Sequence, residues 1–215
     1  MRAVIFDMDG VLADSEPLIC EAAMAMFREK GLAVHEEDFR PFVGTGENRY
    51  LGGVAEKYGF PLDIAEAKRR TYEIYLERLP GRLQPFPGAV PFVQQCRRAG
   101  YKTAVASSAD WIKVEANLKA IGLPPSEWDA LVTAEDVERR KPFPDIFLTA
   151  ARRLNCPPSQ CVVIEDAVNG VAAARAAGMR CIAIAQTFPP ERLQEADRVV
   201  ARMADLTLDD LTGAR

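Results

Sequence analysis

Five short apolar runs are spaced along the chain, and a segment with helical periodicity follows each of them. Polar residues are almost absent from the runs, so a strand built from any of them has two apolar faces. Such strands are typical of parallel sheets that helices cover on both sides. Alternation of this kind predicts a doubly wound, mostly parallel α/β sheet with right-handed crossovers. The predicted strands are residues 4–6, 103–106, 130–132, 161–164 and 181–184.

The helical segments between these strands end in a recognisable way. Gly100, Gly122 and Gly178 each follow one of them, and glycine is the usual C-terminal stop of a helix. In the tail, Val199 and Val200 predict a short edge strand before a final helix. The predicted helices of this part are residues 89–99, 112–121, 144–154 and 167–177.

One region breaks the alternation. Residues 15–83 contain no run of the buried-strand type, and Ser15-Glu16-Pro17 is typical of a helix start. Turn-forming residues at 85–88 mark its far boundary. The sequence therefore predicts an α/β core of residues 1–14 and 84–215, with a helical cap of residues 15–83 inserted after the first strand. The predicted cap helices cover about residues 18–30, 47–58 and 64–78.

The composition is that of a globular protein with a sizeable core. Of 215 residues, 48% are hydrophobic and 27% are charged, which excludes disorder, collagen and coiled coil. There are 27 basic and 31 acidic residues, a formal net charge of −4, which gives no general attraction to nucleic acid or to an anionic membrane. We therefore expect a small-molecule substrate and neither a nucleic-acid nor a membrane partner.

The numbers and positions of cysteine and histidine exclude some kinds of site. The five cysteines form no C-x-x-C pair, which indicates reduced, buried thiols rather than disulfides. His35 is the only histidine, so a histidine-rich zinc site is excluded. The first apolar run stops at Asp7, too early for a signal peptide or a membrane span, and we expect a cytoplasmic protein.

Acidic residues stand at the ends of two predicted strands. Asp7 and Asp9 leave the first strand, and Gly10 allows a tight turn behind them. Taken alone, this pair is at least as compatible with an ordinary turn at a strand end as with a functional site. Glu165 and Asp166 leave a fully apolar strand, where two adjacent carboxylates are costly unless a cation meets them. The second pair is the stronger indication of a ligand.

Hydroxyl and amine groups complete the set. Ser107 and Ser108 follow the second strand just before a helix, a place that suits a phosphate but equally an ordinary helix cap. Lys141 precedes a Pro-x-Pro helix entry and is uninformative alone. In parallel sheets the carboxyl ends of the strands meet at one edge, where ligands bind. Together the four places supply what phosphoryl transfer through an aspartyl-phosphate with Mg²⁺ requires.

With these four motifs, in this order and with an insertion after the first strand, the chain resembles the haloacid dehalogenase (HAD) superfamily over essentially its whole length. It is similar in particular to the β-phosphoglucomutase-like branch. The resemblance implies an HAD-like Rossmannoid core, a helical cap, Mg²⁺ as cofactor and, by analogy, a monomer. It also implies a phosphoric monoester hydrolase acting on a small phosphorylated metabolite, with a sugar phosphate as the expected substrate.

The resemblance assigns a role to each motif residue. Asp7 is expected to be the nucleophile and Asp9 the general acid and base. Ser107 is expected to hold phosphoryl oxygens, assisted by nearby backbone N–H groups, and Lys141 to neutralise their charge; Ser108 is expected among the substrate-binding residues. The implied metal residues are Asp7, Asp9, Asp166 and Glu165.

Within the superfamily, the residues favour a phosphatase over two other activities. Dehalogenases and phosphonate-cleaving relatives lack the second carboxylate, which is Asp9 here. A phosphomutase, the main alternative, carries a cap histidine where this chain has Ile19 and a cap arginine where Glu47 stands. A phospho-accepting regulatory module without turnover is the alternative of another class, and the long cap speaks against it. The cap residues expected near substrate are Gly44, Thr45, Gly46, Arg49 and Arg70.

Overall fold

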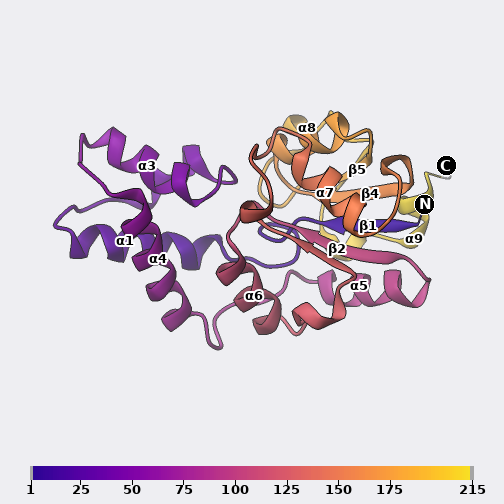
Figure 1. Cartoon of the computed structure of the whole chain (residues 1–215), viewed down its shortest axis with the longest axis horizontal. Coiled ribbons are helices and arrows are strands. Elements are labelled where there is room, and N and C mark those ends of the chain that lie inside the picture. The colour runs from indigo at the N-terminus through magenta and orange to yellow at the C-terminus, as the bar shows by residue number, and fades with distance from the viewer. Residues whose placement is uncertain (1, 214–215) are drawn as a thin grey trace.

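The computed structural model describes residues 2–213, and a six-stranded parallel sheet forms its centre (Figure 1). The strand order is β3-β2-β1-β4-β5-β6, and every neighbouring pair is parallel. The predicted doubly wound sheet is therefore confirmed, including the short edge strand in the tail. The strands are β1 (Ala3–Phe6), β2 (Lys102–Ala106), β3 (Ala130–Val132), β4 (Cys161–Glu165), β5 (Arg180–Ile184) and β6 (Arg198–Val200).

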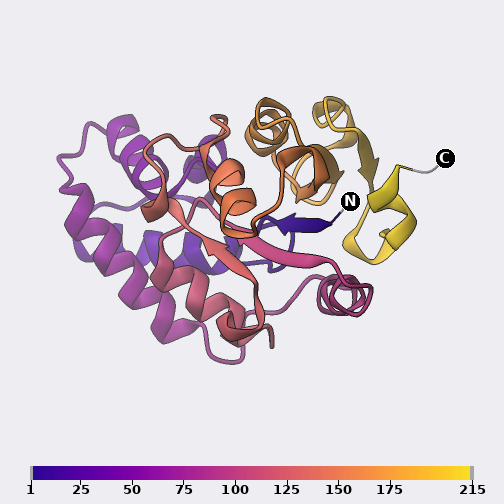
Figure 2. The same cartoon turned by 45° about the vertical axis from the view of Figure 1, so that its right-hand side comes forward.

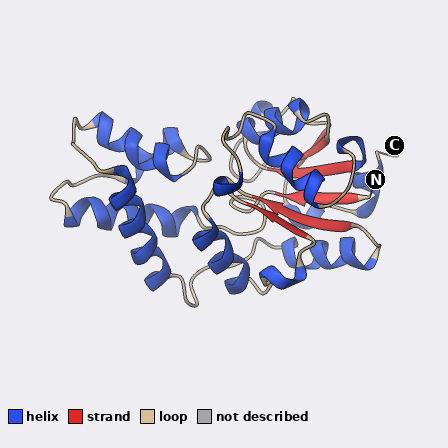
Figure 3. Cartoon of the chain, viewed as in Figure 1, coloured by secondary structure: helices blue, strands red, loops and turns tan. Residues whose placement is uncertain are grey.

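Helices cover both faces of this sheet, as Figure 3 shows in the same view. The helix α2 is the one α-helix among the described residues that the sequence pattern did not predict. The α-helices are α1 (Glu16–Glu29), α2 (Glu36–Phe39), α3 (Glu47–Lys57), α4 (Ile64–Arg78), α5 (Ala89–Arg98), α6 (Trp111–Ala120), α7 (Asp145–Arg153), α8 (Val168–Ala176) and α9 (Leu208–Thr212).

The alternating side chains of β1 show why its run is apolar throughout. Val4 and Phe6 belong to the apolar cluster that includes residues of α5, α6 and α9. Ala3 and Ile5 belong to the cluster on the other face, with residues of α7 and α8. All four are fully buried. A strand sandwiched in this way needs apolar residues at consecutive positions.

The register of the sheet brings three strand ends level with one another. Phe6 of β1 pairs with Val105 of β2 on one side and with Ile164 of β4 on the other. Residues directly after β1 and β2 and at the end of β4 therefore lie side by side. The strand order reverses direction between β1 and β4, which is where open α/β sheets bind ligands.

The four helices α1 to α4, here called the insertion, stand apart from the sheet on its carboxyl side (Figure 1). The helix α1 packs along α4, and α4 contacts α6, as Figure 2 shows from a second direction. The Tyr75 hydroxyl of α4 donates to Asn117 Oδ1 of α6 at 2.6 Å. The boundaries of the core and cap as separate domains stay a prediction.

The start of the insertion differs from the expectation in one respect. Ser15 is the residue before α1, and Pro17 lies in the first turn, as predicted. The Ser15 side chain, however, makes no capping hydrogen bond to the helix. Its hydroxyl donates instead to Asp9, which follows β1. No helix within residues 2–213 combines the length and the apolar character that crossing a bilayer requires.

Phe6 anchors the core beneath the sheet edge, because its ring packs edge-on against Phe92 and Trp128 at centroid distances of 6.2 and 5.9 Å. Phe6→Ala is expected to lower the free energy of unfolding by about 3–5 kcal/mol, measured by urea denaturation. Phe143→Ala is the control, since that ring is 49% exposed and its loss should change stability by about 0.5 kcal/mol or less. Equal losses for the two variants would contradict this account of the core.

Candidate active site

Asp7 lies directly beyond β1, and its side chain is nearly buried, with 9% exposed. The chain then turns at Gly10, whose φ of +85° favours glycine. A Cβ atom at Gly10 would come within 1.9 Å of Asp166 Oδ2, so the turn packs directly against a second carboxylate. A glycine at this point lets the two acidic strand ends approach each other.

The neighbouring strands supply the other expected groups. Ser107 follows β2 and is 1% exposed; its Oγ accepts a hydrogen bond from the Ala109 N–H at 3.1 Å. Glu165 ends β4 and Asp166 follows it, both buried. Asp7, Glu165 and Asp166, here called the acidic cluster, each offer an oxygen within 4.8 Å of the others.

Lys141 bridges the acidic cluster. Its ammonium donates to Asp7 Oδ1 at 2.5 Å and to Glu165 Oε1 at 2.6 Å, and its side chain is only 5% exposed. Burial alone would lower the pKa of Lys141, but the charges of Asp7 and Glu165 outweigh it and hold that pKa above its ordinary value. The amine is therefore a fixed positive charge between two carboxylates.

The second oxygen of Glu165 is also occupied. It accepts hydrogen bonds from the backbone N–H groups of Asp166 and Ala167, both at 2.7 Å. Gly170 of α8 lies against this carboxylate, and a Cβ there would come within 1.8 Å of Glu165 Oε1. Contacts from three sides thus fix the orientation of Glu165.

One lysine does not balance three buried carboxylates. Burial raises the pKa of Asp7 to about 7, against the lowering effect of Lys141, and the charges of Glu165 and Asp9 add to the rise. Burial, with the charges of Glu165 and Asp7, raises the pKa of Asp166 well above its ordinary value. The cluster therefore has an affinity for a further positive charge.

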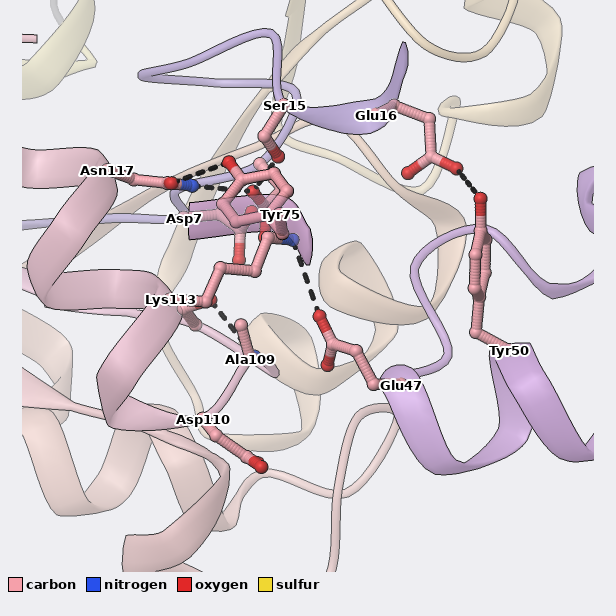
Figure 4. Close-up of polar contacts among 12 residues, drawn as sticks. Asp7, Ser15, Glu16, Glu47, Tyr50, Tyr75, Ala109, Asp110, Lys113 and Asn117 are labelled. Carbon is pink, nitrogen blue, oxygen red and sulfur yellow. Dashed lines mark hydrogen bonds and ion pairs between the residues drawn. The ribbon is translucent and has the colours of Figure 1, made fainter. Parts of the chain in front are cut away.

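Asp9 belongs to a separate network, and Figure 4 labels its partners Ser15, Lys113 and Asn117. Its carboxylate accepts from the Ser15 hydroxyl, from Lys113 Nζ at 3.0 Å and from Asn117 Nδ2 at 3.5 Å. Lys113 is 4% exposed and also donates to Glu47 Oε1 of the insertion at 3.4 Å. The two carboxylates after β1 are thus held by different cations, Asp7 by Lys141 and Asp9 by Lys113.

Lys113 and Asn117 link the sheet edge to the insertion. They lie four residues apart on one face of α6, and each contacts Asp9. On the other side Lys113 meets Glu47 of α3, and Asn117 accepts the Tyr75 hydroxyl of α4. The sequence analysis missed both residues. Their signal was polar residues at positions 113 and 117 of a helical stripe whose neighbours, Val114 and Leu118, are core residues.

A cavity of about 590 Å³ opens between the sheet edge and the insertion. Of the expected site residues, it brings together the following: Asp7, Asp9, Gly44, Gly46, Ser107, Ser108, Lys141, Glu165 and Asp166. It does not include Thr45, Arg49 or Arg70. Thr45 donates to the Phe42 carbonyl, and Arg49 donates to Glu56 at 2.7 Å. Arg70 is held by Glu29 and Glu73.

The turn around Gly44 and Gly46 meets the core loops directly. A Cβ at Gly44 would lie 3.7 Å from Ala167, and one at Gly46 would lie 2.2 Å from a guanidinium nitrogen of Arg140. Gly46 also faces the Ser108 carbonyl. The turn therefore packs against the loops of the core, and only at Gly46 would a Cβ atom come too close to a neighbouring side chain.

A parallel α/β sheet with a carboxylate after its first strand, a buried lysine and a second acidic strand end defines an enzyme that works at the carboxyl edge of the sheet. A comparison with family models gives the class more closely: the haloacid dehalogenase-like hydrolase model matches residues 1–178. The chain belongs to this family. The expected resemblance is confirmed, and the chain is a hydrolase.

Curated relatives cover nearly the whole chain. Protein SUPPRESSOR OF QUENCHING 1, chloroplastic, of Arabidopsis thaliana is 51% identical over 99% of this chain, which spans 21% of that protein. Hexitol phosphatase A of Escherichia coli is 33% identical over 96% of this chain and 94% of its own length. The expected cytoplasmic location stays a prediction.

Solved structures share the same fold. CbbY from Rhodobacter sphaeroides in complex with phosphate is 31% identical, with a TM-score of 0.90 over 99% of both chains. The same protein in complex with xylulose-(1,5)bisphosphate gives a TM-score of 0.89 over 98% of this chain and 99% of that one. These structures confirm the fold class.

Mg²⁺, which the family resemblance implies, fits the acidic cluster. Hard cations prefer oxygen ligands, and three buried carboxylates meet here with one lysine among them. The raised pKa values of Asp7 and Asp166 are a second sign that the cluster lacks positive charge. The donor set and its charge therefore suit a divalent cation.

Gly170→Ala is expected to lower kcat by about 100-fold, because the new methyl group would push Glu165 away from Lys141. Alanine normally stabilises a helix relative to glycine by about 0.5–1 kcal/mol, so helix propensity predicts the opposite effect. The control is Gly52→Ala in α3, where the nearest atom is the flexible end of Ile64 at 3.3 Å. Full activity of Gly170→Ala would show that Glu165 is not held by this contact.

The raised pKa values predict how Mg²⁺ stabilises the protein at different pH. A carboxyl whose pKa is raised on folding contributes stability at low pH that is lost as pH rises through the folded-state pKa, here about 7 for Asp7. The melting temperature of the metal-free protein should therefore fall between about pH 4 and 7. The rise in melting temperature on adding Mg²⁺ should be larger at pH 7.5 than at pH 5, by several degrees. Equal shifts at both pH values would contradict metal binding at this cluster.

Proposed function

We propose that this chain is a Mg²⁺-dependent phosphatase that hydrolyses a small phosphorylated metabolite, a sugar phosphate, through an aspartyl-phosphate intermediate. One observation carries the proposal. Two carboxylates, two residues apart, are held by separate buried lysines: Asp7 by Lys141 and Asp9 by Lys113. Separate surroundings suit separate roles, a nucleophile and a proton carrier.

Asp7 is the proposed nucleophile. Its carboxylate oxygen attacks the phosphorus of the monoester, a P–O bond to Asp7 forms, and the bond to the leaving oxygen breaks. Lys141 lies 2.5 Å from Asp7 Oδ1 and supports the charge that collects on the phosphoryl oxygens. Ser107, which directly follows the neighbouring strand β2, is the proposed donor to one of those oxygens.

Asp9 is the proposed acid and base. It gives a proton to the leaving oxygen, then takes one from the water that attacks the aspartyl-phosphate and releases phosphate. Ser15, Lys113 and Asn117 orient its carboxylate, which leaves 27% of the side chain exposed toward the cavity. Placement of this kind accounts for much of the rate that phosphoryl transfer gains in an enzyme.

Mg²⁺, when bound, would supply positive charge to the transferring phosphoryl group. We propose Asp7, Asp166 and the Asp9 backbone carbonyl as its ligands. Glu165 is proposed beside them rather than on the metal, because its two oxygens already accept hydrogen bonds from Lys141 and from two backbone N–H groups.

Relatives and residues both favour the phosphatase over the phosphomutase. A curated relative is named hexitol phosphatase A, and CbbY has been crystallised with phosphate and with a sugar bisphosphate. Ile19 lines the cavity near the place where mutases carry a histidine. Arg49, the nearest candidate for a mutase arginine, pairs with Glu56 outside the cavity. Water is therefore the proposed acceptor, and the monomeric state and cytoplasmic location remain predictions.

The test is phosphate release from a panel of sugar phosphates, with Mg²⁺ or with EDTA. Release is expected only with Mg²⁺, and Asp7→Asn should lower kcat by at least about 1,000-fold while leaving the fold intact by circular dichroism. Asp166→Asn should raise the Mg²⁺ concentration needed for half-maximal activity. β-Glucose 1-phosphate with a bisphosphate primer is included, since isomerised product without phosphate release would establish the mutase instead.

A further inference from the structure

The cavity is strongly acidic beyond the place proposed for the phosphoryl group. Nine carboxylates line it, against three basic side chains. Three of the acids form the acidic cluster, and a fourth is Asp9. The other five come from the connection after β1 and from the insertion: Asp14, Glu16, Glu21, Glu36 and Glu47.

The three basic side chains are already paired with carboxylates, so little positive charge remains to bind a ligand. Lys141 is shared between Asp7 and Glu165. Lys113 is shared between Asp9 and Glu47, and its third side faces the Tyr75 ring at 5.9 Å. Arg40 is the remaining one, with 69% of its side chain exposed at the mouth and Glu36 at 4.0 Å.

Nearby cations outside the cavity lining offset part of this acidity, because Arg78 and Arg82 pair with Glu21. Lys68 of α4 pairs with Asp110 at 2.5 Å. Arg140 is not among the lining residues, although its guanidinium would lie 2.2 Å from a Cβ atom at Gly46.

The N-termini of α3 and α6 at this seam carry their own carboxylates. The helix α3 begins at Glu47, and Asp110 is the N-cap residue of α6. A helix N-terminus attracts anions through its free N–H groups and its dipole. An acidic side chain in that position interacts with the same groups in place of a ligand anion. Neither end is therefore open to a second anionic group.

Two carboxylates of the insertion lie next to Asp9. Glu47 is 7% exposed; its Oε1 accepts from Lys113, its Oε2 is buried, and the Tyr72 hydroxyl lies close to this carboxylate. Glu16 accepts the Tyr50 hydroxyl at 2.8 Å through one oxygen, and Figure 4 shows its other oxygen turned toward the middle of the site. One ammonium joins Glu47 to Asp9, so Glu47 lies near the oxygen that Asp9 would protonate.

We propose that Glu47 and Glu16 make the cavity selective for a phosphate monoester whose leaving group offers hydrogen-bond donors and carries no second negative charge. The inference rests on the proposed phosphatase function and narrows its substrate class. Hydroxyl or amino groups on carbons near the ester oxygen donate to these carboxylates, and such charge-assisted hydrogen bonds are strong. A second phosphate would meet several carboxylates in a partly closed cavity, where like charges repel more than in water.

The test measures competition with p-nitrophenyl phosphate, whose hydrolysis needs no recognition of a sugar. The matched competitors are xylulose 5-phosphate against xylulose-(1,5)bisphosphate, and glucose 6-phosphate against glucose 1,6-bisphosphate. Each monophosphate is expected to compete at a concentration at least about tenfold lower than its bisphosphate. Glucosamine 6-phosphate separates the two donor types, since tighter competition than by glucose 6-phosphate identifies an amino group as the preferred donor.

Glu47→Gln isolates the carboxylate charge. The preference for the monophosphate over its bisphosphate should fall several-fold in this variant, because a repelling charge is removed while the side chain keeps its size. Glu56→Gln on the same helix is the control, since Glu56 is 66% exposed and lies outside the cavity, and the preference should not change. If Glu47→Gln does not fold, Glu16→Gln carries the same test.

Two results would overturn the inference. The first is a wild-type protein for which a bisphosphate competes as well as its monophosphate. The second is a preference that is the same in Glu47→Gln as in the wild type. A wild-type protein that releases phosphate from no monophosphate of the sugar phosphate panel with Mg²⁺ overturns the proposed function itself and, with it, this inference.

Discussion

The buried ammonium of Lys141 between Asp7 and Glu165 is the interaction on which the rest of the site depends. Without it, three carboxylates would be buried together with no positive charge, a costly arrangement. Lys141 lies in the connection between β3 and α7, and one ammonium contacts both acids because β1 lies beside β4 in the sheet. Burial, with the charges of the neighbouring acids, raises the pKa values of Asp7 and Asp166, and this cluster is the one proposed to hold Mg²⁺.

A second ammonium joins the two parts of the fold. Lys113 contacts Asp9 of the sheet edge and Glu47 of the insertion, and Asn117 makes a parallel link through Tyr75. The proposed acid therefore takes its orientation partly from residues that the insertion brings over the cavity. Lys113 and Asn117 of α6 therefore connect the insertion to the carboxylate of Asp9. Glu47, which contacts the same lysine, is the residue proposed to face the leaving group.

Most of the fold could be predicted because it depends on local pattern. Apolar runs in the sequence predicted all six strands. The sequence pattern predicted all the described α-helices except α2, whose four residues are too few to show a helical period. The motif residues Asp7, Ser107, Lys141 and Asp166 were predicted from strand ends and from the family resemblance. Of the predicted cap residues, Gly44 and Gly46 line the cavity, while Arg49 and Arg70 pair with acids elsewhere on the insertion.

The sequence by itself determined the parallel sheet, the place of the insertion and the acidic residues at the strand ends, since each of these follows from neighbouring residues and from the geometry of strands. Only the tertiary structure decided which charges pair. Lys113 is 104 residues from Asp9, and Lys141 is 134 residues from Asp7. Charge pairing depends on distances in space that sequence spacing does not encode. Lys141 was expected at the site from the family resemblance and Lys113 was missed, and only the fold showed which aspartate each lysine contacts.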